Sequence, residues 1–166
     1  VLNVELLAYN FHESINLKPL FLDLAQQIRE SRDRRAPSWG VRVQRLAREI
    51  ASKQSFTLEA HGSAFRRSLD FGEMLENNSS VALDPEEVTI EGIVSTIALR
   101  VLKVDPVEDQ IRVRLEVTTS RANQDPLITR TEFSVGFYDL PMIDNTRLAT
   151  GQRCAITLVN FSRKDK

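Results

Sequence analysis

The sequence predicts an α+β fold in which a helical hairpin packs on a mainly antiparallel sheet of five or six strands. Apolar residues recur at helical spacing in the first third of the chain. In the second half apolar and polar residues alternate with a period of two. Asp-Pro pairs at 84–85, 105–106 and 125–126 each precede a β-type run, and such pairs favour turns between strands. The resulting meander can remain open or curl into a barrel or a sandwich.

Two helices are predicted between residues 19 and 53. Residues 19–31 place their apolar side chains on one face, and residues 39–53 carry a second apolar stripe. Ser38 is a suitable N-cap for the second helix. The polar segment between the stripes is short, so the two helices are expected to form a hairpin. Residues 1–9 are apolar and partly alternating, which predicts a strand.

Residues 55–162 are predicted to form the β-rich part of the chain. The elements expected in it are a strand over 56–66, a short helix over 68–75, and strands over 88–104, 110–121, 127–138 and 153–161. Short connections separate the three longest strands, and such connections join only antiparallel neighbours. Gly92, inside the first of the three, is expected to mark a bulge.

The second and third of these long strands are expected to have one wet face and one buried face. The side chains predicted to be buried are Val113, Leu115, Val117, Phe133, Val135 and Phe137. The helix residues expected to face them are Leu24, Ile28, Val43, Leu46 and Ile50.

Length and composition are those of one globular domain, so a single domain is expected over residues 1–166. No apolar run approaches the roughly 18 residues that span a bilayer, and residues 1–10 lack the basic segment of a signal peptide.

The single cysteine, Cys154, excludes an internal disulfide and favours a reducing, cytoplasmic location. Because residue 1 is Val rather than Met, we expect a processed product or a piece of a longer protein.

Charge is unevenly distributed in a chain whose net charge is −1. Residues 29–53 hold eight basic and three acidic residues, whereas residues 68–99 hold seven acidic residues and no Lys or Arg. The two regions can be solvated faces that neutralise each other within the fold. They can also meet between chains, which would steer association. In a third interpretation the arginines contact phosphates. The charged candidates for an interface are Arg42, Arg45, Arg48, Glu86 and Glu87.

Residues that carry catalytic chemistry are sparse. His12 and His61 each lie near a serine, but sequence neighbours do not make a catalytic dyad. Cys154 lies in an apolar segment, where it is expected to be a small buried hydrophobe rather than a nucleophile. No metal-ligand spacing, Walker A motif or G-x-G-x-x-G motif is present. We therefore expect no catalytic residues, no metal and no cofactor.

Residues 137–148 connect two predicted strands yet contain many apolar residues. Hairpin tips are usually short and polar. The segment can fold back over one end of the core, or it can form an exposed contact surface made of Tyr138, Leu140, Pro141, Met142 and Ile143. Trp39 has the same two alternatives, as a cap of the core or as an interface anchor.

These patterns favour a non-catalytic interaction or assembly module, either a whole protein or one domain of a larger one. The partner is expected to be another protein or a second copy of the chain. The alternative is a binding domain for a small apolar or phosphorylated ligand between the sheet and the helices. Nucleic-acid binding through the arginine-rich hairpin is a third and weaker hypothesis, because no aromatic-rich RNA motif accompanies the arginines.

Overall fold

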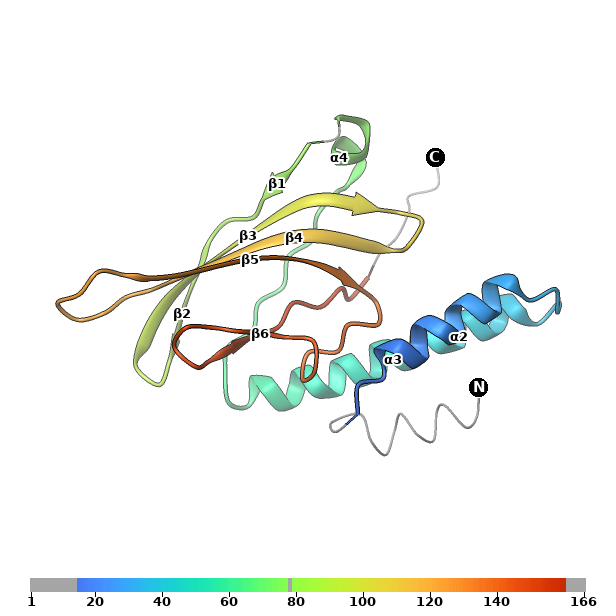
Figure 1. Cartoon of the computed structure of the whole chain (residues 1–166), viewed down its shortest axis with the longest axis horizontal. Coiled ribbons are helices and arrows are strands. Elements are labelled where there is room, and N and C mark those ends of the chain that lie inside the picture. Colours follow the sequence, from blue (N-terminus) through green and yellow to red (C-terminus); the bar gives the residue numbers. More distant parts are fainter. Residues whose placement is uncertain (1–14, 78, 161–166) are drawn as a thin grey trace. The chain divides into compact units, whose positions relative to one another are not determined.

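The computed structural model describes residues 15–77 and 79–160, which form two compact units (Figure 1). The helical unit contains residues 15–58, 137–145 and 155–160. The sheet unit contains the described residues between Glu59 and Gly136 together with Thr146–Cys154. The α+β class is confirmed, whereas the single domain and the packing of the hairpin on the sheet stay predictions. The strand predicted over residues 1–9 lies outside the described residues.

The helical unit is built on α2 (Lys18–Glu30) and α3 (Ala36–Glu59), which lie side by side as the predicted hairpin (Figure 1). The second helix begins earlier than predicted, so Ser38 is not its N-cap. The Ser38 hydroxyl instead donates a hydrogen bond to the Arg35 carbonyl at 2.7 Å. Pro37 is tolerated because it lies in the first turn, where its missing N–H has no helical partner.

The strand predicted over 56–66 is wrong, because α3 continues through Glu59. Ile50 and Gln54 are both fully buried and lie one helical turn apart, so the buried face of the helix extends past the predicted end. Phe56 and Leu58, which suggested a strand, are 77% and 40% exposed. Their apolar character therefore does not mark a face packed on the core.

The core of the helical unit joins both helices to the segment that follows β5. Its buried members are Leu17, Phe21, Val43, Leu46, Ala47, Ile50 and Leu140. The Phe21 ring stacks on the Tyr138 ring, with centroids 5.6 Å apart. Residues 138–140 thus fold onto the helices, as in the first of the two alternatives for the apolar connection.

The sheet unit contains an antiparallel sheet of five strands among the described residues. The strands are β1 (Val81–Ala82), β2 (Glu86–Ile90), β3 (Ile93–Asp105), β4 (Gln110–Thr119) and β5 (Leu127–Gly136). The order is β1-β3-β4-β5, and β2 pairs with the same edge of β3 as β1 does. The predicted sequential antiparallel pairing is confirmed, and the sheet does not close into a barrel.

The strand predicted over 88–104 is two strands joined by a two-residue turn. Glu91 and Gly92 have φ values of 53° and 77°. Positive φ at both central residues is the mark of a type I′ hairpin turn, whose twist matches that of paired strands. Gly92 therefore lies in a turn, and the bulge lies further on, between Val101 and Lys103.

The short elements differ most from prediction. Helix α4 is Gly72–Asn77 and begins after Asp70, whose carboxylate accepts the Gly72 N–H at 3.0 Å. Strand β7 is only Arg153–Cys154, paired with β6 (Thr146–Arg147). The rest of the predicted strand 153–161 has no regular structure as far as residue 160, because no neighbouring strand pairs with it in the described chain.

The two faces of the β3–β5 sheet differ as the alternation predicts. Val113, Leu115, Val117 and Val135 are buried, as is Phe137 just beyond β5. Phe133 is only half-buried, because β5 is an edge strand of the described sheet and water reaches its side chains. The opposite face, called the outer face below, carries charged side chains.

Candidate interaction surface

The apolar interface candidates Tyr138, Met142 and Ile143 lie in the loop that follows β5, and hydrogen bonds fix the backbone of this loop. The Met142 N–H donates to Gln54 Oε1 at 3.0 Å, and the Ile143 N–H donates to the Leu140 carbonyl at 3.0 Å. Tyr138, Met142 and Ile143 are all half-buried. Tyr138 packs against the core of the helical unit and Leu140 is buried in it, whereas a contact role for Met142 and Ile143 stays a prediction.

Polar side chains fasten the same loop at several points. Asp144 accepts the Leu140 N–H at 2.9 Å, and the Asn145 side-chain amide donates to the Pro141 and Met142 carbonyls at 3.1 and 2.9 Å. The Lys18 ammonium forms an ion pair with Asp139, which ties the start of α2 to the loop. Such local bonds satisfy backbone groups that a buried loop would otherwise leave unpaired.

Gln54→Leu is expected to destabilise the protein by about 1–3 kcal/mol, because the Met142 N–H would lose its acceptor. Gln54 is 0% exposed, so water cannot replace the lost bond. The free energy of unfolding from urea titrations measures the effect. Gln26→Leu is the matched control, since Gln26 is exposed and donates only to Glu30 on the next turn. Equal losses in the two variants would contradict a structural role for the buried amide.

Trp39 forms one wall of an apolar recess of about 380 Å³ in the helical unit. The other lining residues are Leu24, Gln27, Ile28 and Ser31. The Trp39 side chain is half-buried, so part of the indole remains available to a ligand. The recess lies between the last two turns of α2 and the first turn of α3.

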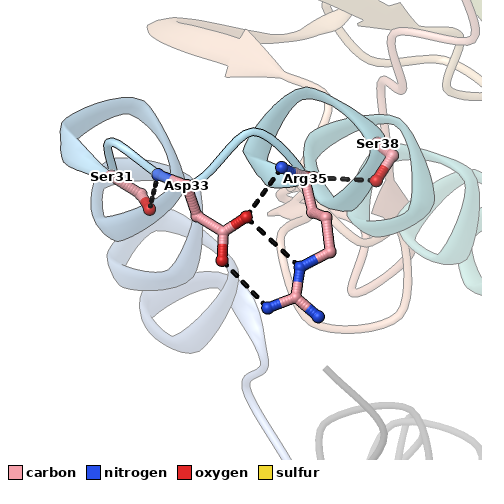
Figure 2. A network of polar contacts seen from close by, with 4 residues as sticks. All are labelled: Ser31, Asp33, Arg35 and Ser38. Carbon is pink, nitrogen blue, oxygen red and sulfur yellow. Dashed lines mark hydrogen bonds and ion pairs between the residues drawn. The ribbon is translucent and has the colours of Figure 1, made fainter.

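Polar contacts among Ser31, Asp33, Arg35 and Ser38 order the loop between the helices, next to Trp39 in the sequence (Figure 2). Asp33 accepts the Arg35 backbone N–H at 2.8 Å and binds the Arg35 guanidinium through Nε at 3.2 Å and Nη2 at 2.9 Å. The Asp33 N–H donates to the Ser31 hydroxyl at 3.2 Å. The Arg35 guanidinium in turn lies over the Trp39 ring, 5.1 Å from its centroid. A cation over an indole face is favourable, so the loop orients both residues.

The Asp33–Arg35 contact also determines how this loop responds to pH. The hydrogen bonds from the Arg35 side chain, and then the one from its backbone N–H, hold the pKa of Asp33 below its ordinary value. The ion pair is therefore complete above the ordinary pKa of an aspartate and is lost as the pH falls through the lowered value.

Three further arginines lie close in the sequence to the lining residues and have no carboxylate partner among the described residues. Arg29, Arg32 and Arg34 are exposed, and none of them has a hydrogen bond or ion pair in the part of the chain that the structure describes. Glu30, which follows Arg29 in the sequence, accepts a hydrogen bond from the Gln26 side-chain amide at 2.9 Å. An apolar recess with an excess of unpaired positive charge around it can accept an apolar group that carries acidic neighbours. We call this recess and its three arginines the tip site.

The predicted charged candidates occupy two different settings. Arg42, Arg45 and Arg48 lie exposed along α3, where Arg45 pairs with Glu49 at 3.9 Å and the Arg48 guanidinium lies 5.0 Å from the Phe137 ring centroid. The structure thus gives each of Arg45 and Arg48 a neighbour within the helical unit.

The two acidic candidates differ from each other. Glu86 forms an ion pair with Arg67, which neutralises it within the sheet unit. Glu87 is exposed. The acidic stretch therefore retains less free charge than its composition indicates.

Catalytic chemistry finds little support among the described residues. Burial raises the pKa of the Cys154 thiol, which disfavours the nucleophilic thiolate. No three His, Cys, Asp or Glu side chains among residues 15–77 and 79–160 cluster as metal ligands would. His12 lies outside the described residues, and His61 is exposed. The expected absence of catalysis, metal and cofactor stays a prediction.

Comparisons with known proteins assign neither a family nor a function to the chain. No protein-family model, curated protein or solved structure matches the chain. None of the described helices combines the length and apolar character that crossing a bilayer requires.

Sequence reasoning identified Trp39 but missed the rest of the tip site. Leu24 and Ile28 are predicted to be core residues; they do pack against the core of the helical unit, but they also line the recess. Helical spacing shows which residues share a face but not how completely that face is covered. Arg29, Arg32 and Arg34 were counted in the basic region, but their lack of partners depends on the loop conformation. The excess of arginine between the two helices was the available signal.

Proposed function

We propose that the chain is a non-catalytic assembly module whose tip site binds an apolar anchor flanked by acidic residues. The observation that carries this proposal is the recess beside Trp39 together with three exposed arginines, close to it in the sequence, that have no carboxylate partner among the described residues. Tryptophan and arginine are the residues most enriched among those that dominate binding energy at protein interfaces. The single cysteine supports a cytoplasmic setting for this assembly.

A second copy of the chain supplies a suitable anchor. Residues 81–91 contain Val81 and Leu83 beside Asp84, Glu87 and Glu91, the last three exposed. Glu86 contributes less, because it is already paired with Arg67. The arginines would steer the acidic stretch towards the recess, and burial of an apolar side chain against Trp39 would slow its release. The alternative ligand site between sheet and helices stays a prediction.

Self-association should therefore be salt-sensitive and should change the fluorescence of Trp39, the single tryptophan. Sedimentation velocity over a wide protein concentration range is expected to show a dimer at about 0.05 M salt that dissociates towards 0.5 M, because the Debye length falls below about 5 Å. Trp39→Ala is expected to weaken association at least about tenfold, the cost of about 1.4 kcal/mol from one lost anchor.

A charge-matched pair of variants tests the arginines. The triple change of Arg29, Arg32 and Arg34 to Ser should weaken association, mainly through the on-rate. The same change at Arg66, Arg121 and Arg147, which are exposed in the sheet unit, should have little effect. A chain that stays monomeric at low salt, or two triple variants with equal effects, would contradict assembly through the tip site.

A further inference from the structure

The outer face of the sheet places like charges directly opposite each other on neighbouring strands. Arg100 on β3 is the register partner of Arg114 on β4, and Lys103 is the partner of Arg112. All four side chains are exposed. Cross-strand like-charge pairs destabilise a sheet, so the fold itself gains nothing from this arrangement.

Carboxylates neutralise this group only in part. Glu132 on β5 binds Arg114 Nη2 at 2.6 Å and lies 3.6 Å from Arg112 Nη2. Of the other acids on β3–β5, Glu116 pairs with Arg130 at 2.6 Å, and the Asp105 carboxylate accepts the Val107 and Glu108 N–H groups at 3.0 and 3.1 Å.

The two cations on β3 have no acidic partner in the part of the chain that the structure describes. There the Arg100 guanidinium donates to the Ser80 hydroxyl at 3.3 Å and pairs with no carboxylate. Lys103 has no hydrogen bond or ion pair within residues 15–77 and 79–160. Two pairs of cations thus share one carboxylate, and their charge is directed to solvent.

From this juxtaposition we infer that the outer face of β3 and β4 binds the phosphate backbone of double-stranded nucleic acid. Neighbouring strands are about 4.8 Å apart, so the two cations of each pair can reach the same phosphate. The planar guanidinium group of arginine can donate two parallel hydrogen bonds to the oxygens of one phosphate.

The remaining residues of this face favour a duplex over other anions. The outward residues of β3–β5 include no aromatic side chain on which unpaired bases could stack. Contacts to phosphates alone position a protein on a duplex without reading its sequence. This surface is separate from the tip site and does not depend on the assembly proposed above.

Fluorescence anisotropy with a labelled DNA duplex of about 20 base pairs tests the inference, with salt varied from about 50 to about 200 mM. The intact chain should bind with a steep salt dependence. The double variant Arg100→Ser and Lys103→Thr should reduce the slope of log K against log salt by about 1.8, since each lost phosphate contact removes about 0.9. Circular dichroism should show an unchanged fold, because neither side chain has an acidic partner to lose.

Arg66→Ser with Arg121→Ser, at exposed positions outside both β3–β5 and the tip site, is the control with the same change in net charge, and it should leave the slope nearly unchanged. The inference is overturned if the intact chain fails to bind at about 50 mM salt. It is also overturned if the control lowers the slope as much as the sheet variant does, or if the chain binds anionic vesicles but not the duplex.

Discussion

Phe21→Ala is expected to lower the free energy of unfolding by about 3–5 kcal/mol, the usual cost of truncating a buried aromatic side chain. Phe21 is 0% exposed and lies in the core cluster between α2, α3 and Leu140. Its ring also stacks on Tyr138, so the variant would lose an aromatic contact as well as buried area. The cavity would lie where the two helices and the loop after β5 meet, and none of these can collapse into it without moving the others.

Trp39 fluorescence during urea unfolding measures this loss directly, because the single tryptophan belongs to the helical unit. Leu22→Ala is the neighbouring control, since Leu22 is 47% exposed and lies outside the core cluster. Its effect should be far smaller than that of Phe21→Ala. A loss below about 1 kcal/mol for Phe21→Ala would show that the cluster does not hold the hairpin together.

Leu115→Ala should lower the free energy of unfolding by about 2–5 kcal/mol. Leu115 is 1% exposed on β4, where its register partners are Leu99 on β3 and Thr131 on β5. The central position of the strand restricts relaxation, because β4 is hydrogen-bonded along both edges. The cavity should therefore remain largely open, which increases the cost of the substitution.

Far-UV circular dichroism during urea unfolding measures the loss in the sheet unit. Ile128→Ala is the control, because Ile128 lies on the outer face of β5 and is 50% exposed. It should have a much smaller effect than Leu115→Ala. Similar losses in the two variants would mean that the inner and outer faces have been assigned the wrong way round.

The sequence by itself determined the class of the fold and most of its long elements. Strands β4 and β5 could be predicted because each has one solvent-exposed face and one buried face. Only such strands show a clear alternation of polar and apolar residues in the sequence. The hairpin was predicted for the equivalent reason, since two apolar stripes at 3.6-residue spacing must each be covered.

The local sequence pattern gave the wrong secondary structure where apolar residues are exposed or where a turn has an unusual sequence. Phe56 and Leu58 resembled the start of a strand, but Gln54 is buried and the helix continues past them. The turn at Glu91 and Gly92 was read as a bulge, because glutamate seldom adopts positive φ and Asn-Gly or Asp-Gly is the usual signal.

Only the tertiary structure decided which charged and apolar side chains remain available for binding. Arg35 and Asp33 neutralise each other beside Trp39, while Arg29 has no such partner within residues 15–77 and 79–160. On the sheet, the register of β3 against β4 sets Lys103 opposite Arg112, and a shift of one residue would direct the same side chains to the other face. A sequence specifies the type and spacing of its residues, but whether a cation meets a carboxylate depends on loop geometry and strand register, which bring together residues distant in the chain.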